Sequence, residues 1–128
     1  FRGEAPNLMA AVGTDLADIR SGVLAQSIAK GDKIIERIVR RAAMFIGRAV
    51  GDVVNLLLPD VVILGGGLVE ALPELFLEGV TAGAAERVAP AYMKVFKILT
   101  SKLGDDAVVR GSAAWCQQQI EKTLEEKV

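Results

Sequence analysis

A run of four large aliphatic residues, entered by a proline and followed by three glycines, constrains the fold of this chain more than any other feature. Residues 61–64 read Val-Val-Ile-Leu, between Pro59-Asp60 and a Gly-Gly-Gly triplet at residues 65–67. Unbroken apolar character over a short run predicts a strand covered on both faces, as in a parallel sheet of an α/β domain. Because proline has a fixed φ and no N–H, Pro59 marks the entry to this strand.

Gly65, Gly66 and Gly67 are the candidate ligand-contacting residues of the chain. Glycine tolerates positive φ and lets a ligand approach the bare main chain, and ligands of open α/β sheets bind beyond the carboxyl ends of strands. The triplet equally suits a plain tight turn between a strand and a helix, and this pattern alone leaves both interpretations open. The spacing is not G-x-G-x-x-G and no Gly-Lys-Ser/Thr follows, which disfavours a dinucleotide fingerprint and a Walker A loop.

The composition predicts a soluble globular chain with a sizeable core. Hydrophobic residues make up 52% and charged residues 24% of the 128 residues. A net charge of −1 argues against nucleic-acid binding driven by bulk charge. No apolar run reaches the roughly 18–20 residues that a membrane span needs. The absence of a signal-peptide pattern and the single cysteine, Cys116, favour a cytoplasmic location. The lack of histidine removes the usual general base and the usual zinc ligand.

Periodicity predicts the order helix, long helix, strand, glycine loop, helix, strand, helix. Residues 1–13 are expected to be irregular because Gly3, Pro6 and Gly13 interrupt them, and residues 121–128 to be a frayed tail. The predicted helices cover about residues 14–29, 32–57 and 73–88, with a last helix after residue 104; the predicted strands cover residues 61–64 and 94–100. Two strands are too few for a doubly covered sheet. We therefore expect residues 1–128 to be a single partial domain, the closing portion of a larger α/β domain.

The helix expected over residues 32–57 is the longest element, with Asp32 as its N-cap. Large apolar residues near helical spacing predict its buried stripe, at Ile34, Ile38, Phe45, Ala49, Val53 and Leu56, broadened by Ile35, Ala42, Ile46 and Val50. Gly47 and Gly51, four residues apart, would let another backbone pack closely against one side of this helix.

Several segments resemble the C-terminal part of ROK proteins. They are Gly31-Asp32, residues 55–67 with the arrangement helix-Asn-x-x-x-Pro-Asp-strand-Gly-Gly-Gly, residues 103–107 (Leu-Gly-Asp-Asp-Ala) and residues 111–114 (Gly-Ser-Ala-Ala). The resemblance covers about residues 14–116. That family comprises bacterial repressors, open reading frames and sugar kinases on an actin/hexokinase-like ATPase fold. The resemblance implies an α/β fold, helix-rich with few strands, that is the C-terminal portion of an actin-like (ribonuclease H-like) ATPase lobe.

The resemblance also implies roles for individual residues. Gly65, Gly66 and Gly67 would contact the adenosine side of a nucleotide, and the full-length protein would use ATP with Mg and a small-molecule sugar. Asn55 and Asp60 match the motif and are interpreted as helix-end and strand-entry structure, and residues 104–107 as support for the last helix. The family's phosphate loop, catalytic Asn-Asp motif, sugar-binding Glu-x-Gly-His motif and cysteine-rich zinc segment lie upstream of this part and are not in the sequence. No catalytic or metal-binding residue is therefore assigned.

Two functions remain open for the parent protein. It is predicted to be an ATP-dependent sugar kinase of which this chain alone is inactive; the alternative is the sensor lobe of a sugar-responsive repressor with an added helix-turn-helix. A third, weaker interpretation is a degenerate lobe kept for oligomer contacts. The intact glycine triplet favours the kinase. A homo-oligomer is expected because an unpaired strand edge favours self-association. The identity of the sugar cannot be read from this chain.

Overall fold

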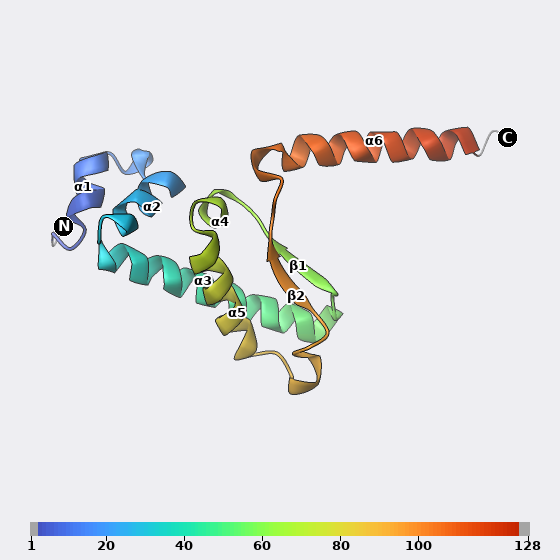
Figure 1. The fold of residues 1–128 in the computed structure, drawn as a ribbon, viewed down its shortest axis with the longest axis horizontal. Coiled ribbons are helices and arrows are strands. Elements are labelled where there is room, and N and C mark those ends of the chain that lie inside the picture. The colour runs from blue at the N-terminus through green and yellow to red at the C-terminus, as the bar shows by residue number, and fades with distance from the viewer. Residues whose placement is uncertain (1–2, 126–128) are drawn as a thin grey trace.

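The computed structural model describes residues 3–125, which form a helix-rich α/β fold with one small sheet (Figure 1). The helices are α1 (Pro6–Val12), α2 (Ser21–Ala29), α3 (Lys33–Leu57), α4 (Gly67–Ala71), α5 (Pro73–Ala85) and α6 (Ala107–Glu125), and short 3-10 turns lie at Leu16–Asp18, Pro90–Tyr92 and Gly104–Asp106. The strands β1 (Val61–Leu64) and β2 (Lys97–Thr100) pair in parallel, with Val61 opposite Lys97. The predicted α/β class, the long helix and the strand at residues 61–64 are confirmed.

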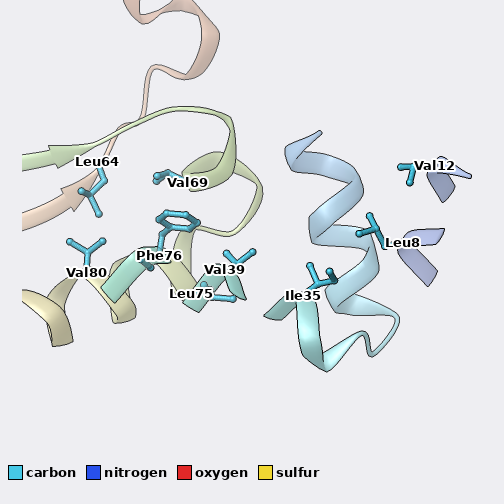
Figure 2. Packing of buried hydrophobic residues seen from close by; sticks show 10 residues of the cluster. Leu8, Val12, Ile35, Val39, Leu64, Val69, Leu75, Phe76 and Val80 are labelled. Carbon is cyan, nitrogen blue, oxygen red and sulfur yellow. The ribbon is translucent and has the colours of Figure 1, made fainter. Parts of the chain in front are cut away.

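The core lies where the sheet packs against α3 and α5. Leu64 of β1 points toward Phe76 and Val80 of α5, and Val39 of α3 lies on the same side (Figure 2). A second part of the same cluster joins α1 to the start of α3 through Leu8, Val12 and Ile35. The sheet is thereby fixed to a helical layer, and the loop that follows β1 starts from a rigid support.

Glycines form the contact between α3 and α5. Gly47 and Gly51 of α3 and Gly79 and Gly83 of α5 are all buried. A Cβ atom added at Gly51 would lie 2.9 Å from the carbonyl oxygen of Ala84, and one added at Gly79 would lie 2.6 Å from the Cβ of Ala43. These separations leave no room for a methyl group. The prediction that Gly47 and Gly51 admit a second backbone is confirmed.

The predicted buried stripe of α3 is largely wrong, although Ile35, one of its members, is buried. The buried positions are Ile35, Val39, Ala43, Gly47, Gly51 and Val54, at spacings of three or four residues. By contrast, Phe45 is 51% exposed and Leu56 is 79% exposed. The glycines determine which side of α3 faces α5, because the helices approach each other along the line that lacks side chains. The large apolar residues then lie to the side of that line.

The irregular structure expected for residues 1–13 is also corrected, because residues 6–12 form helix α1. Pro6 occupies the first turn, where its missing N–H leaves no helical hydrogen bond unmade. Leu8 and Val12, four residues apart, bury one face of the helix. The first turn also receives a carboxylate acceptor from Asp32, far along the chain, so no local sequence signal revealed this helix.

Asp32 is the N-cap residue of α3, as predicted, but its carboxylate joins three elements instead of accepting a hydrogen bond from that helix. Its carboxylate is 2% exposed and accepts hydrogen bonds from the N–H of Leu8 at 2.8 Å and the hydroxyl of Ser27 at 2.6 Å. The amide of the Asn7 side chain donates a further bond at 2.8 Å. No side-chain hydrogen bond caps α3 itself. Burial would raise the pKa of Asp32, but the hydrogen bonds from Ser27, Leu8 and Asn7 outweigh it and hold this pKa below the ordinary 3.8.

We expect Asp32→Ala to lower the melting temperature by about 5–10 °C, because it leaves buried donors of α1 and α2 without an acceptor. A lowered native pKa means that Asp32 contributes fully above about pH 4 and loses this contribution as the pH falls through that native value. Thermal unfolding at pH 7 and at pH 3 measures both effects. Asp15→Ala is the control, because the exposed Asp15 carboxylate accepts one hydrogen bond, from the N–H of Ala17. Equal shifts for the two variants, or a difference that persists at low pH, would contradict this role.

Several further boundaries differ from the predictions. The strand expected over residues 94–100 begins at Lys97, and the helix expected over residues 73–88 ends at Ala85. The helix expected from residue 14 begins instead at Ser21, after a 3-10 turn at Leu16–Asp18 and an extended Arg20. The tail expected to fray is helical as far as Glu125, and the rest of it, residues 126–128, lies outside the described residues. Helix α6 extends away from the other elements (Figure 1). Its side chains from residue 108 to 124 are exposed. Among residues 3–125, no helix is long and apolar enough to cross a membrane.

Candidate nucleotide site at the strand ends

The three glycines form an exposed loop at the carboxyl end of β1, where the sequence placed them. We call residues 65–67 the glycine loop. Gly66 has a φ of 101° and precedes α4, and Gly67 is the first residue of that helix. The carbonyl oxygen of Gly66 accepts a hydrogen bond from the N–H of Glu70 at 3.1 Å. The loop therefore turns directly from the strand into a short helix with its main chain open to solvent.

The parallel register brings the end of β2 beside the glycine loop. The N–H of Ser101 donates to the carbonyl oxygen of Leu64 at 2.7 Å, one residue past the last pair of the sheet. A cleft of about 310 Å³ opens between the two strand ends. It is lined by Leu64, Gly65, Val69, Glu70, Pro73, Thr100, Ser101, Lys102 and Gly104. Here, at the carboxyl ends of parallel strands, α/β proteins hold their ligands. We call this hollow the strand-end cleft.

Three polar side chains of this cleft were not identified from the sequence: Glu70, Ser101 and Lys102. Glu70 comes from α4, whose existence was not predicted, and the other two directly follow β2. A usable signal was the Ser-Lys pair immediately after the second strand, since residues after parallel strands meet at one edge of a sheet. The carboxylate, hydroxyl and ammonium groups give this cleft hydrogen-bonding groups of each kind.

The space around each glycine separates the two interpretations of the triplet. A Cβ atom at Gly67 would lie 3.0 Å from the hydroxyl oxygen of Ser21, so close packing of α4 on α2 explains this glycine. At Gly65 the nearest atom would be the Cβ of Ser101, at 3.7 Å. At Gly66 a Cβ would meet nothing within 4 Å, but the φ of 101° restricts the position to glycine. Gly66 thus combines a glycine-only conformation with open space.

A second and larger hollow also borders the glycine loop. It measures about 560 Å³ and reaches Ala42 and Ile46 of α3, Ile63 of β1 and Phe76 of α5. All three glycines line it, whereas only Gly65 also lines the strand-end cleft. We call it the apolar hollow, because the side chains that line it are all apolar. The strand-end cleft therefore contains polar side chains, whereas the apolar hollow does not.

Asn55 and Asp60 make structural contacts, as interpreted from the sequence. The side-chain amide of Asn55 donates to the carbonyl oxygen of Arg87 at 2.8 Å, and its oxygen accepts from the N–H of Ala89 at 2.9 Å. The carbonyl oxygen of Asp60 accepts from the N–H of Lys97 at 3.0 Å, which begins the pairing of the strands. Asn55 therefore links the end of α3 to the segment after α5.

The cleft offers groups that hold a ligand. The strand-end cleft offers the main chain of Gly65 and several polar side chains that can form hydrogen bonds with a ligand, and the open main chain of Gly66 lies next to Gly65 in the same loop. No group of three or more acidic, cysteine or histidine side chains that could hold a metal ion lies among residues 3–125.

Comparison with known proteins assigns this chain to a family. The sequence model of the ROK family matches residues 5–119. The chain belongs to the ROK family. A glucokinase of Thermotoga maritima is 25% identical over 91 residues, which are 71% of this chain and 28% of the glucokinase. The crystal structure of a proposed sugar kinase of Cytophaga hutchinsonii shares the fold with a TM-score of 0.67 at 20% identity, over 89% of this chain and 40% of that protein.

This ROK chain therefore spans less than half the length of both relatives. The resemblance stated from the motifs at residues 55–67 and 103–114 is confirmed, because both segments lie within the matched range. The shared fold accounts for the helix-rich α/β arrangement with a two-stranded parallel sheet. Both relatives contain many residues that have no counterpart in this chain.

Proposed function

We propose that this chain forms the adenosine-binding side of the C-terminal, actin-like lobe of an ATP-dependent sugar kinase. One observation carries the proposal: the glycine loop ends a parallel strand with exposed main chain, directly beside a polar cleft of about 310 Å³. Membership of the ROK family and similarity to a glucokinase support a sugar kinase as the parent protein. The sugar and Mg would then contact parts of the protein outside this chain.

The glycine loop and the residues of the strand-end cleft would together hold the nucleotide without reacting with it. The main chain at Gly66 allows the flat base and ribose to approach closely, because no side chain intervenes. The hydroxyl of Ser101 and the carboxylate of Glu70 are suited to ribose hydroxyls, and the ammonium of Lys102 favours the negative charge of the phosphates. ATP, when bound, supplies the phosphoryl group. Phosphoryl transfer also needs a base for the sugar hydroxyl and metal-bound phosphates.

We expect this chain alone to make no sugar phosphate from ATP and Mg²⁺. The sequence has no histidine and none of the catalytic motifs of the family, so no residue is positioned as the base. The test mixes the purified chain with ATP, Mg²⁺ and a panel of hexoses and amino sugars, and follows sugar phosphate by mass spectrometry. The Thermotoga maritima glucokinase serves as the positive control. Sugar phosphate formed at enzymatic turnover, and absent without the chain, would refute the proposal that the catalytic residues lie outside this chain.

The glucokinase relative favours the kinase over the alternative of a repressor's sensor lobe. A kinase and a repressor of this family would differ in the sequence outside this chain. A catalytic Asn-Asp motif and a phosphate loop in the remaining sequence would support the kinase, whereas a helix-turn-helix would support the repressor. ADP binding by this chain tests the adenosine site separately from that choice.

A further inference from the structure

A further hollow of about 380 Å³ lies between α5 and the edge of β2 that does not pair with β1 (Figure 1). We call it the edge pocket. Its walls come from α5, from the turn that follows this helix and from the start of β2: Leu77, Thr81, Ala84, Ala85, Met93, Phe96, Lys97, Ile98 and Leu99. The edge pocket shares no lining residue with the strand-end cleft or the apolar hollow, so it is a separate site.

The main chain of Ile98 provides hydrogen-bonding groups at this pocket. The N–H groups of Lys97 and Ser101 point toward β1, because they donate to the carbonyl oxygens of Asp60 and Leu64. Main-chain groups alternate between the two edges of a strand, so the N–H and C=O of Ile98 face the free edge. Within residues 3–125 no further strand lies beside that edge. The N–H of Ile98 is therefore available to a ligand.

The walls of the edge pocket are mainly apolar. Leu77 and Phe96 face it from opposite sides, and the apolar Met93 and Leu99 are still 44% and 48% exposed. Methionine adapts its shape to an occupant more readily than branched side chains do. A concave site of this size, with apolar walls and a few polar groups, is typical of sites that bind small molecules.

The charge of the edge pocket indicates which small molecule fits. Of the described residues that line it, Lys97 alone is charged, and no aspartate or glutamate is among them. Lys97 is exposed, so its stem can add to the apolar wall while its ammonium stays at the mouth. A carboxylate at the mouth would accept charge-assisted hydrogen bonds from this ammonium and from the N–H of Ile98.

We propose that the edge pocket binds an aliphatic carboxylate, a molecule with an unbranched apolar chain and one anionic head group. The chain lies between α5 and β2, against Leu77 and Phe96, and the head group lies beside Lys97. A lysine on an edge strand is a feature that opposes pairing with a further strand, which favours a small ligand over an added peptide strand. This site does not depend on the proposed nucleotide site, which is formed by other residues.

The experiment titrates the ¹⁵N-labelled chain with hexanoate, octanoate and decanoate and follows the amide signals by NMR. Decanoate should shift the signals of Ile98 and Leu99 and saturate them, with a dissociation constant of about 1 mM or below. Affinity should rise by about tenfold for every two methylene groups added to the chain. Decylammonium has the same chain and the opposite charge, and it should bind at least about tenfold more weakly than decanoate.

Two pairs of variants test the walls and the charge separately. Ala85→Phe fills the edge pocket from α5 and should abolish binding, whereas Ala82→Phe is the matched control, because Ala82 is exposed on the same helix and does not line the pocket. Lys97→Glu should reverse the preference, so that decylammonium binds more tightly than decanoate. Lys94→Glu is its control, because Lys94 is exposed and lies outside the lining. Circular dichroism checks that each variant is folded.

The outcomes that overturn the proposal are specific. Decanoate that shifts no signal near Ile98, or shifts it without saturation, would exclude the site. Equal affinity for decanoate and decylammonium, or a preference that Lys97→Glu leaves unchanged, would show apolar adsorption without recognition of the carboxylate. Equal binding by Ala85→Phe and Ala82→Phe would place the ligand outside the edge pocket.

Discussion

Gly83→Ala is expected to lower the free energy of unfolding by about 1–3 kcal/mol, although alanine normally stabilises a helix interior relative to glycine by about 1 kcal/mol. A Cβ atom at Gly83 would meet the carbonyl oxygen of Met44 and would lie 3.0 Å from the backbone nitrogen of Arg48. Both atoms belong to the main chain of α3, which cannot turn aside as a flexible side chain can. The two helices must move apart, and the core between them opens.

Urea denaturation followed by circular dichroism measures this effect. Gly22→Ala is the matched control, because Gly22 lies in helix α2 and a Cβ there would meet nothing within 4 Å. We expect that variant to be unchanged or more stable, by up to about 1 kcal/mol. If Gly83→Ala were as stable as Gly22→Ala, the close approach of α3 and α5 would not be what holds the core together.

Gly66→Val is expected to weaken ADP binding by about tenfold or more, which corresponds to a loss of about 1.4 kcal/mol. A φ of 101° is a conformation that valine avoids, so the substitution distorts the glycine loop. Its side chain would also enter the open space through which the base approaches the main chain. Isothermal titration calorimetry with ADP measures the change in affinity.

Gly31→Val separates backbone strain from loss of the site. Gly31 also has a φ of 101°, and a Cβ there would meet nothing within 4 Å, but it lies between α2 and α3 and lines neither the strand-end cleft nor the apolar hollow. Both valine variants should lose similar stability, and Gly31→Val should bind ADP like the unchanged chain. Equal losses of affinity in the two variants would show that the effect comes from folding, and unchanged binding by Gly66→Val would exclude the glycine loop as a contact.

The sequence predicted those features of the fold that depend on local chemistry. The apolar run at residues 61–64 and the proline before it were enough to place β1, and the position of the glycine loop followed from them. The long helix α3 was evident from its period. Helix α1 was not, because its first turn depends on a carboxylate from Asp32. The buried side of α3 was misread because large apolar residues were given more weight than Gly47 and Gly51.

The candidate site was predictable only in part, for a related reason. Gly65, Gly66 and Gly67 identified the strand end from which a ligand would be bound. Ser101 and Lys102 join them only through the parallel register of β1 and β2, which pairs residues 36 positions apart. The position of β2 was predicted, but the alignment of its end with the glycine loop was not. The polar half of the cleft thus depends on a long-range contact that local patterns do not contain.

The most direct test of the adenosine site is an NMR titration of the ¹⁵N-labelled chain with ADP. The account predicts that the amide signals of the glycine loop and of Ser101 shift progressively and saturate, and that sugar alone causes no such change. If ADP shifts none of these signals, or shifts only signals remote from the ends of β1 and β2, the glycine loop is not part of a nucleotide site.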